Sequence, residues 1–342
     1  MTAELTIIVT TSVLVLLLAA GMLYQFVGAR LDIRRYAPPG AMIDVDGQRL
    51  HLVCAGSGQP AVLFESGIAA SSLSWAGVFP DVAAFTRVCA YDRAGLGWSD
   101  PSRAPRTVTQ MVTELRGIVA HAAADGPAVL VGHSFGAFLA LAYASQYPAG
   151  TAGLVLLDPP SEWHQLTRPQ TRLLWGGIQL SRIGAVLARV GVVRACLALL
   201  TGGAPSVPRH FVRVFGPKAA RTVERLVGEV RKLPPGVHPI VQALWCQPKC
   251  FRAMADHLGA LQEMAAAVGR VTSLSDVPLV IISGSHESPD TIAAHRQLAQ
   301  LSSRGRHMIA TNSGHWIQLD EPGIVVTTIR EIVERARRPT AA

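Results

Sequence analysis

Residues 128–147, AVLVGHSFGAFLALAYASQY, join a strand-like apolar run to a helix-like one through a tight turn flanked by glycines. The first part is rich in β-branched residues and favours a buried strand, whereas the alanine- and leucine-rich second part favours a helix that Pro148 ends. Between the two, Gly132, Ser134 and Gly136 fit the pattern G-x-S-x-G. Because larger side chains would collide at so sharp a turn, the pattern predicts a serine presented between a strand and a helix.

The same alternation of strand and helix patterns continues on both sides of this stretch, from residue 41 onward. A hairpin over residues 44–53 is predicted to turn at Asp46-Gly47. The strands expected after it are 61–65, 87–91, 128–132, 153–157, 278–283 and 306–311. The pattern indicates an α/β fold with a mostly parallel central sheet and helices on both faces. With 342 residues and 49% apolar content, the chain is neither disordered nor fibrous.

A long insertion separates the fourth and fifth of these expected parallel strands. Residues 161–270 show helical patterning and hold 15 Lys and Arg against 5 Asp and Glu. We interpret them as a helical lid on a core formed by residues 42–160 and 271–335. Within the lid, residues 171–200 set arginines among aliphatic residues, a pattern that also occurs at anionic lipid interfaces. We favour the alternative, a lid helix packed on the core with its arginines in water.

Residues 5–27, LTIIVTTSVLVLLLAAGMLYQFV, form an uncharged stretch near the start of the chain. A helix of this length crosses a hydrocarbon core of roughly 30 Å. We interpret it as a single transmembrane helix rather than a cleaved signal peptide, because no Lys or Arg precedes it and no A-x-A site follows it. Residues 28–41, which include Pro38-Pro39-Gly40, are expected to form a linker.

The charges beside the span indicate an orientation. Arg30, Arg34 and Arg35 follow it, and Glu4 is the only charged side chain before it. The positive-inside rule therefore places the large domain on the cytoplasmic side of the membrane. The net charge of +8 is not interpreted as nucleic-acid binding, because the 6% of aromatic residues form no strip interleaved with arginine.

The cysteines give no sign of a disulfide framework or a metal site. The chain has five at irregular spacing: Cys54, Cys89, Cys196, Cys246 and Cys250. In a chain of this length we expect them to be mostly reduced. Cys246 and Cys250 lie four residues apart, but no second pair with metal-binding spacing accompanies them, so we expect no metal. No cofactor is implied either.

Three further segments accompany GHSFG at 132–136: ESG at 65–67, YDRAGLGWS at 91–99 and SGHWIQLDEP at 313–322. Together they resemble the α/β-hydrolase family over about residues 42–335. The resemblance implies the α/β-hydrolase fold, a nucleophile at Ser134, and triad partners in the chain order Ser, acid, His. Serine at this position disfavours the family's epoxide hydrolase and haloalkane dehalogenase activities, which use aspartate there.

The resemblance assigns the general base to His315 and leaves the acid open. Asp158 directly follows the strand 153–157, as in the lipase arrangement, whereas Glu287 follows the strand 278–283, the commoner position. Asp290, close to Glu287, is a third alternative. We favour Asp158, because the chain resembles a group of membrane-anchored hydrolases that share ESG and VGHSFG and often lack an acid after the seventh strand.

The oxyanion hole is expected from two backbone N–H groups, those of Phe135 and Ile68. The family's usual His-Gly is replaced here by Ser66-Gly67, which leaves a backbone donor intact. The resemblance thus implies a membrane-anchored serine hydrolase that cleaves small-molecule or lipid-like carboxylic esters through an acyl-enzyme. The alternatives are an acyltransferase, lyase or perhydrolase on the same triad, and a non-catalytic membrane interaction protein that keeps the fold.

Overall fold

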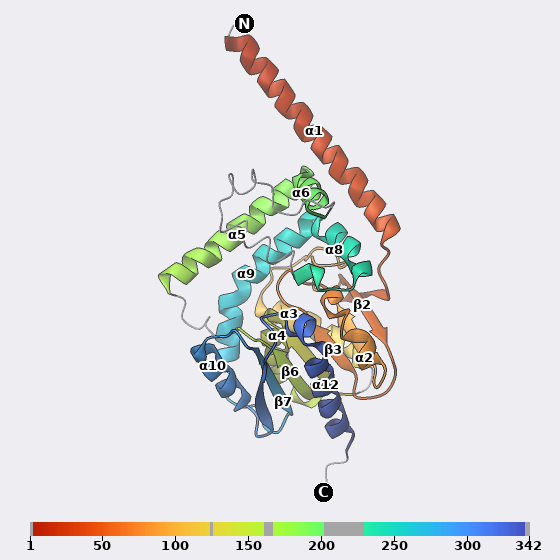
Figure 1. Cartoon of the computed structure of the whole chain (residues 1–342), viewed down its shortest axis with the longest axis vertical. Coiled ribbons are helices and arrows are strands. Elements are labelled where there is room, and N and C mark those ends of the chain that lie inside the picture. Colours follow the sequence, from red (N-terminus) through yellow and green to blue (C-terminus); the bar gives the residue numbers. More distant parts are fainter. Residues whose placement is uncertain (1–2, 124–125, 161–166, 202–228, 339–342) are drawn as a thin grey trace.

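The computed structural model describes residues 3–123, 126–160, 167–201 and 229–338. Its strands form a single sheet in the order β1-β2-β4-β3-β5-β6-β7-β8 (Figure 1). They are β1 (Ala41–Val45), β2 (Gln48–Ala55), β3 (Val62–Glu65), β4 (Val88–Tyr91), β5 (Ala128–His133), β6 (Thr151–Leu157), β7 (Leu279–Gly284) and β8 (Gly305–Ala310). β2 runs antiparallel to β1 and β4, and all other neighbours are parallel. The predicted sheet is confirmed, including the hairpin turn at Asp46-Gly47, where both residues have positive φ.

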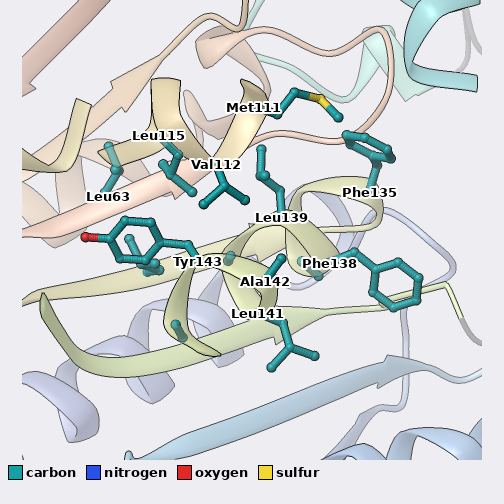
Figure 2. Packing of buried hydrophobic residues seen from close by; sticks show 14 of the residues in the cluster. Leu63, Met111, Val112, Leu115, Phe135, Phe138, Leu139, Leu141, Ala142 and Tyr143 are labelled. Carbon is teal, nitrogen blue, oxygen red and sulfur yellow. The ribbon is translucent and has the colours of Figure 1, made fainter. Parts of the chain in front are cut away.

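Helices cover both faces of this sheet. α3 (Val108–Ala123) and α4 (Phe135–Gln146) pack on one face, and α2 (Phe79–Ala83) and α12 (Pro322–Arg337) pack on the other. Figure 2 shows side chains of α3 and α4 packed together on the first of these faces, among them Val112, Leu115 and Leu139. Because both faces are covered, the central strands are continuous apolar runs rather than alternating ones.

Shorter elements connect these layers. They are the 3-10 helices η1 (Ser72–Trp75) and η2 (Pro148–Gly150), together with α10 (Pro289–Ala299) and α11 (Ile317–Asp320). η1 follows β3, α10 lies between β7 and β8, and α11 precedes α12. The loops that follow the carboxyl ends of the parallel strands therefore gather at one edge of the sheet.

The insertion after β6 is helical where the structure describes it. It contains α5 (Arg168–Arg189), α6 (Val192–Thr201), the 3-10 helix η3 (Pro235–Val237), α8 (His238–Trp245) and α9 (Pro248–Gly269). α9 packs on α3 and α4, and α5 packs on α9 through close approaches at Gly177 and Gly184. Residues 161–166 and 202–228 of the predicted lid lie outside the described residues. The division into core and lid stays a prediction.

The N-terminal helix α1 (Ala3–Arg35) is longer than the predicted span. It continues through most of the expected linker, which shortens to residues 36–40. Polar contacts with the folded domain hold its last turns: Gln25 Nε2 donates to the Cys246 carbonyl at 2.9 Å, and Arg194 donates to Gln25 Oε1 at 3.0 Å and pairs with Asp32 at 2.7 Å. α1 is long and apolar enough to cross a membrane, and most of its length projects from the body (Figure 1).

One cysteine prediction was wrong. Cys54 and Cys89 form a disulfide, because they face each other in the register of the antiparallel strands β2 and β4, with their Cα atoms 4.1 Å apart. Cys196, Cys246 and Cys250 are free thiols, as expected. Burial raises the pKa of the Cys246 thiol to about 11 and that of Cys250 to about 12, so both are protonated at neutral pH.

Candidate active site

Ser134 lies on the turn between β5 and α4. Its φ of 54° falls in the left-handed region, which a non-glycine residue rarely adopts, and its N–H donates to the Leu157 carbonyl at 2.9 Å. The flanking glycines are needed for close packing. A Cβ at Gly132 would lie 2.6 Å from the Cα of Ala137, and one at Gly136 would lie 2.4 Å from the Glu65 carbonyl oxygen. The serine is therefore held in a strained turn that only this glycine pair permits.

His315 lies in the loop between β8 and α11. Its Nδ1 is 2.6 Å from Oδ2 of Asp158, the residue that follows β6. Asp158 is buried, with 3% of its surface exposed, and its other oxygen accepts the N–H of Gly284 at 3.3 Å. A buried carboxylate bound on both oxygens fixes the imidazole so that Nδ1 carries the proton and Nε2 is left for chemistry.

The charge of Asp158 is set by these contacts. Burial by itself would raise the pKa of Asp158, but the hydrogen bond and charge of His315 and the N–H of Gly284 outweigh it and lower that pKa below its ordinary value. The carboxylate is therefore ionised at neutral pH and faces the imidazole as an anion.

The structure brings Glu287 to the same place. A carboxylate oxygen of Glu287, one of Asp158 and a ring nitrogen of His315 all lie within 4.8 Å of one another, and Glu287 is half-buried. The Nδ1–H of His315 donates to Asp158. Asp290 is exposed in the first turn of α10, where a carboxylate complements the helix N-terminus, so it is not brought into this group.

A buried arginine anchors the loop that follows β3. Arg93, 2% exposed, binds the carboxylate of Glu65 and the backbone carbonyls of Ser66 and Gly67, the last at 2.6 Å. The Gly67 carbonyl and the Ile68 N–H belong to one trans peptide and point in opposite directions. Because Arg93 binds the carbonyl, the N–H of Ile68 points away from Arg93.

The loop that carries this N–H lies beside the serine turn. A Cβ built on Gly67 would come 3.5 Å from the Cβ of Ser134, so the loop and the turn are in contact. Phe135 begins α4, and the first N–H groups of a helix have no partner within it. Both expected oxyanion-hole donors, Ile68 and Phe135, thus belong to backbone segments next to Ser134. Arg93 and Gly67 are 26 positions apart, so residue spacing does not predict this anchoring contact.

His133 contacts the loop that carries His315. Its Nε2 lies 2.8 Å from the His315 carbonyl oxygen, and its ring lies 4.7 Å from the rings of both His315 and Trp316. Burial and the neighbouring His315 lower the pKa of His133 to about 3, so the ring is neutral and Nε2–H is the donor. The pattern G-x-S-x-G gave no signal for this contact, because it joins residues 182 positions apart.

An apolar pocket lies next to this site, and neither Ser134 nor His315 is among its lining residues. It has about 490 Å³ of empty space, part of it open to solvent, and extends from Ile68 and Trp316 to residues of the insertion. Its lining is formed by Ile68, Ala69, Ala70, Ser71, Leu73, Ser74, Glu229, Val230, Leu233, Val241, Trp245, Trp316 and Leu319. Its apolar lining meets the site at Ile68, whose N–H is one of the expected oxyanion donors.

Sequence comparison agrees with this architecture. A family model described as "alpha/beta hydrolase fold" matches residues 60–176, which include β3 to β6 and the Ser134 turn. The chain has the α/β-hydrolase fold. The predicted fold is thereby confirmed. The α/β-hydrolase structures that resemble it include the epoxide hydrolase CorEH, at 20% identity and a TM-score of 0.63, covering 87% of this chain and 99% of that chain.

Two further α/β-hydrolase-fold structures are an esterase and a lactonase. The thermophilic esterase from Thermogutta terrifontis is 20% identical with a TM-score of 0.59, and the match covers 87% of this chain and 97% of that chain. The enol-lactonase from Burkholderia xenovorans LB400 is 18% identical with a TM-score of 0.57, covering 86% and 100%. At these identities the likeness concerns the fold.

Curated relatives of this α/β-hydrolase-fold chain match it in part. The uncharacterized protein YqjL of Bacillus subtilis is 38% identical over 104 residues, which is 30% of this chain and 41% of that protein. The abhydrolase domain-containing protein abhd-5.2 of Caenorhabditis elegans is 26% identical over 277 residues, which is 77% of this chain and 56% of that protein. The chain spans less than half the length of the first relatives it matches.

Proposed function

We propose that this chain is a membrane-anchored serine hydrolase that cleaves carboxylic esters through an acyl-enzyme on Ser134. The observation that carries the proposal is the 2.6 Å hydrogen bond between His315 and the buried Asp158, together with a serine on a strained turn whose preceding residue, His133, binds the His315 carbonyl. This arrangement of a nucleophile, a base and an anion that orients the base is what acyl transfer requires.

The proposed reaction uses each group at a stated atom. His315 Nε2 takes the proton of the Ser134 hydroxyl as Oγ attacks the ester carbonyl, and Asp158 stabilises the imidazolium. The N–H groups of Ile68 and Phe135 bind the oxyanion. The imidazolium then gives its proton to the leaving alcohol, which leaves an ester on Ser134. Water then attacks the ester on Ser134 by the same proton transfers and releases the carboxylic acid.

The pocket supports an apolar ester as the substrate. Apart from Glu229 and two serines, its lining consists of apolar side chains, and two tryptophans, Trp245 and Trp316, lie among them. A long hydrocarbon group would be removed from water there, at about 25 cal/mol for each Å² of apolar surface buried. Anchoring by α1 would keep the enzyme beside the bilayer in which such esters concentrate.

The test is hydrolysis by the full-length protein in detergent. We expect p-nitrophenyl esters from acetate to palmitate to be cleaved, with a burst of p-nitrophenol equal to the enzyme concentration. Ser134→Ala should lower kcat by about 10³-fold or more. Addition of an alcohol or of peroxide distinguishes hydrolysis from acyl transfer or perhydrolysis by the product formed. Equal rates for wild type and Ser134→Ala would contradict the proposal.

A further inference from the structure

Helix α5 is apolar on two opposite sides. One side, which includes Leu174 and Ile178, is buried, and α9 packs against this helix. The other side carries large apolar side chains that stand in the open: Leu173 at 76% exposed, Trp175 at 57%, Leu180 at 52%, Ile183 at 51% and Val186 at 55%. Arg172 and Gln179 are also exposed on this side, so it is apolar and basic, a character typical of a helix that lies in a lipid interface.

The same character continues into α6, where Val192 and Leu199 are exposed. Among the residues that the structure describes, every exposed large apolar side chain outside α1 lies on α5 or α6, with Ile309 as the one exception. Large apolar side chains that gather in the open on two neighbouring helices indicate an interaction site. We call the seven residues of α5 and α6 the outer face.

The charges beside the outer face fit an anionic lipid surface. Arg182 and Arg189 are exposed and lie seven residues apart on α5, so they share one flank of the helix. Trp175 lies seven residues before Arg182 on that same flank. Arginine extends its charge to lipid headgroups while its stem stays apolar, and tryptophan is enriched at membrane interfaces.

The position of α1 places this surface at membrane level. The corner between α5 and α6 touches α1: a Cβ at Gly21 would lie 2.3 Å from the Val190 carbonyl oxygen, and one at Gly191 would lie 3.1 Å from Tyr24. Gly21 is near the end of the uncharged stretch 5–27, about 24 Å along the helix from Leu5. The corner therefore lies where the span would leave the hydrocarbon core, and Figure 1 shows α5 and α6 at the end of the molecule from which α1 projects.

We propose that the outer face of α5 and α6 lies in the interface of an anionic bilayer, as a second membrane contact beside α1. The inference rests on the proposed membrane anchoring. This placement also brings the pocket close to the bilayer. Gln25 of α1 donates to the carbonyl of Cys246, and the residue before Cys246, Trp245, lines the pocket. The insertion would then receive apolar esters directly from the lipid.

Quenching of tryptophan fluorescence by brominated lipids tests the contact without reference to catalysis. The full-length protein and its Trp175→Phe variant are compared in phosphatidylcholine–phosphatidylglycerol liposomes. One set of liposomes carries bromine on the acyl chains close to the headgroups, and the other set carries none. α1 contains no tryptophan, so the anchor itself gives no signal. We expect wild type to be quenched more than Trp175→Phe. Equal quenching of the two in liposomes that carry the protein on flotation would overturn the outer-face proposal and leave the anchor intact.

Flotation separates this result from failure of the anchor. Protein that does not float with the liposomes would contradict the membrane anchoring and with it the outer-face proposal, whatever the enzyme's activity. The quenching result is independent of whether Ser134 is catalytic.

A second comparison uses substituted proteins. Leu180→Asp combined with Ile183→Asp places charge on exposed positions, so the fold is retained. We expect hydrolysis of a long-chain ester in anionic vesicles to fall about tenfold, with hydrolysis of a water-soluble ester unchanged. The matched control is Ile309→Asp, which changes an exposed apolar residue on β8. An equal loss in the control, or no loss in the double variant, would contradict the proposal.

Discussion

Asp158 and His315 are 157 residues apart in the chain, yet Oδ2 of the first lies 2.6 Å from Nδ1 of the second. The sheet explains this proximity. Ser134 follows β5, Asp158 follows β6 and His315 follows β8, and these strands run parallel with β7 between the last two. The carboxyl ends of parallel strands meet at one edge, where open α/β sheets place their sites.

The choice between the two acids leads to a direct prediction. Asp158→Asn should lower kcat by about 10² to 10⁴-fold, because an amide does not stabilise the imidazolium as a carboxylate does. Glu287→Gln should lower kcat by less than about tenfold, because Asp158 accepts the hydrogen bond from Nδ1–H. Steady-state kinetics on one ester compares the two. The reverse order of losses would move the role to Glu287.

Arg93 should affect stability and catalysis separately. Arg93→Met leaves the buried Glu65 without its cationic partner and with only the Tyr91 hydroxyl bound to it, and we expect a loss of about 3 to 5 kcal/mol in the free energy of unfolding. The double variant Glu65→Gln with Arg93→Met should regain most of that stability but keep a kcat lowered about tenfold or more, because the Gly67 carbonyl is still released. Denaturant unfolding and kinetics on the same samples measure both quantities. Full recovery of kcat in the double variant would show a structural role alone.

His133 should make the fold sensitive to acid. In the folded state its pKa is about 3, whereas an unfolded histidine titrates near 6.5, so between these values the unfolded chain binds the extra proton. The contribution of neutral His133 is therefore fully present above about pH 6.5 and decreases as the pH falls toward 3, by at most about 1.4 kcal/mol per pH unit.

The variant His133→Gln keeps a donor for the His315 carbonyl and removes this titration. Its free energy of unfolding, measured in denaturant at pH 7 and pH 5, should differ less between the two conditions than that of wild type. His257 is buried, and burial also lowers its pKa, so it remains as a common background in both proteins. An unchanged pH dependence in His133→Gln would contradict the assignment.

The pocket should set the preference for acyl length. Trp245→Ala enlarges the pocket at its wall on α8, so we expect the ratio of kcat/KM for a long-chain ester to that for a short-chain ester to rise about tenfold. The matched control is Ile309→Ala, which is not among the pocket's lining residues and should leave the ratio unchanged. A ratio that does not move with Trp245 would place the hydrocarbon group elsewhere.

Much of the fold could be predicted because buried strands are recognisable locally. β3, β5 and β6 consist largely of apolar residues between turn signals, and their predicted bounds are within two residues of those observed. Ser134 and His315 stood in short motifs whose spacing carries the chemistry. The acid could not be settled in this way, because Asp158 and Glu287 follow the adjacent strands β6 and β7 and both come close to His315.

Contacts between distant segments explain what was missed. The Cys54–Cys89 disulfide depends on the register of β2 against β4, which residue spacing does not specify. It also bears on the membrane side: disulfides are typical of oxidising compartments, whereas Arg30, Arg34 and Arg35 indicate a cytoplasmic domain. The cytoplasmic placement stays a prediction. Likewise, α1 extends to Arg35 because it is held by Gln25 and Asp32 against the folded domain.

The measurement that tests the central claim most directly is covalent labelling with a fluorophosphonate, followed by peptide mapping. Such a reagent reacts with a serine activated by a neighbouring base, whatever the natural substrate. We predict one adduct, on Ser134, in the detergent-solubilised full-length protein, and loss of labelling in Ser134→Ala and in His315→Ala. A folded wild type that stays unlabelled, or a label that persists in Ser134→Ala, would contradict the account.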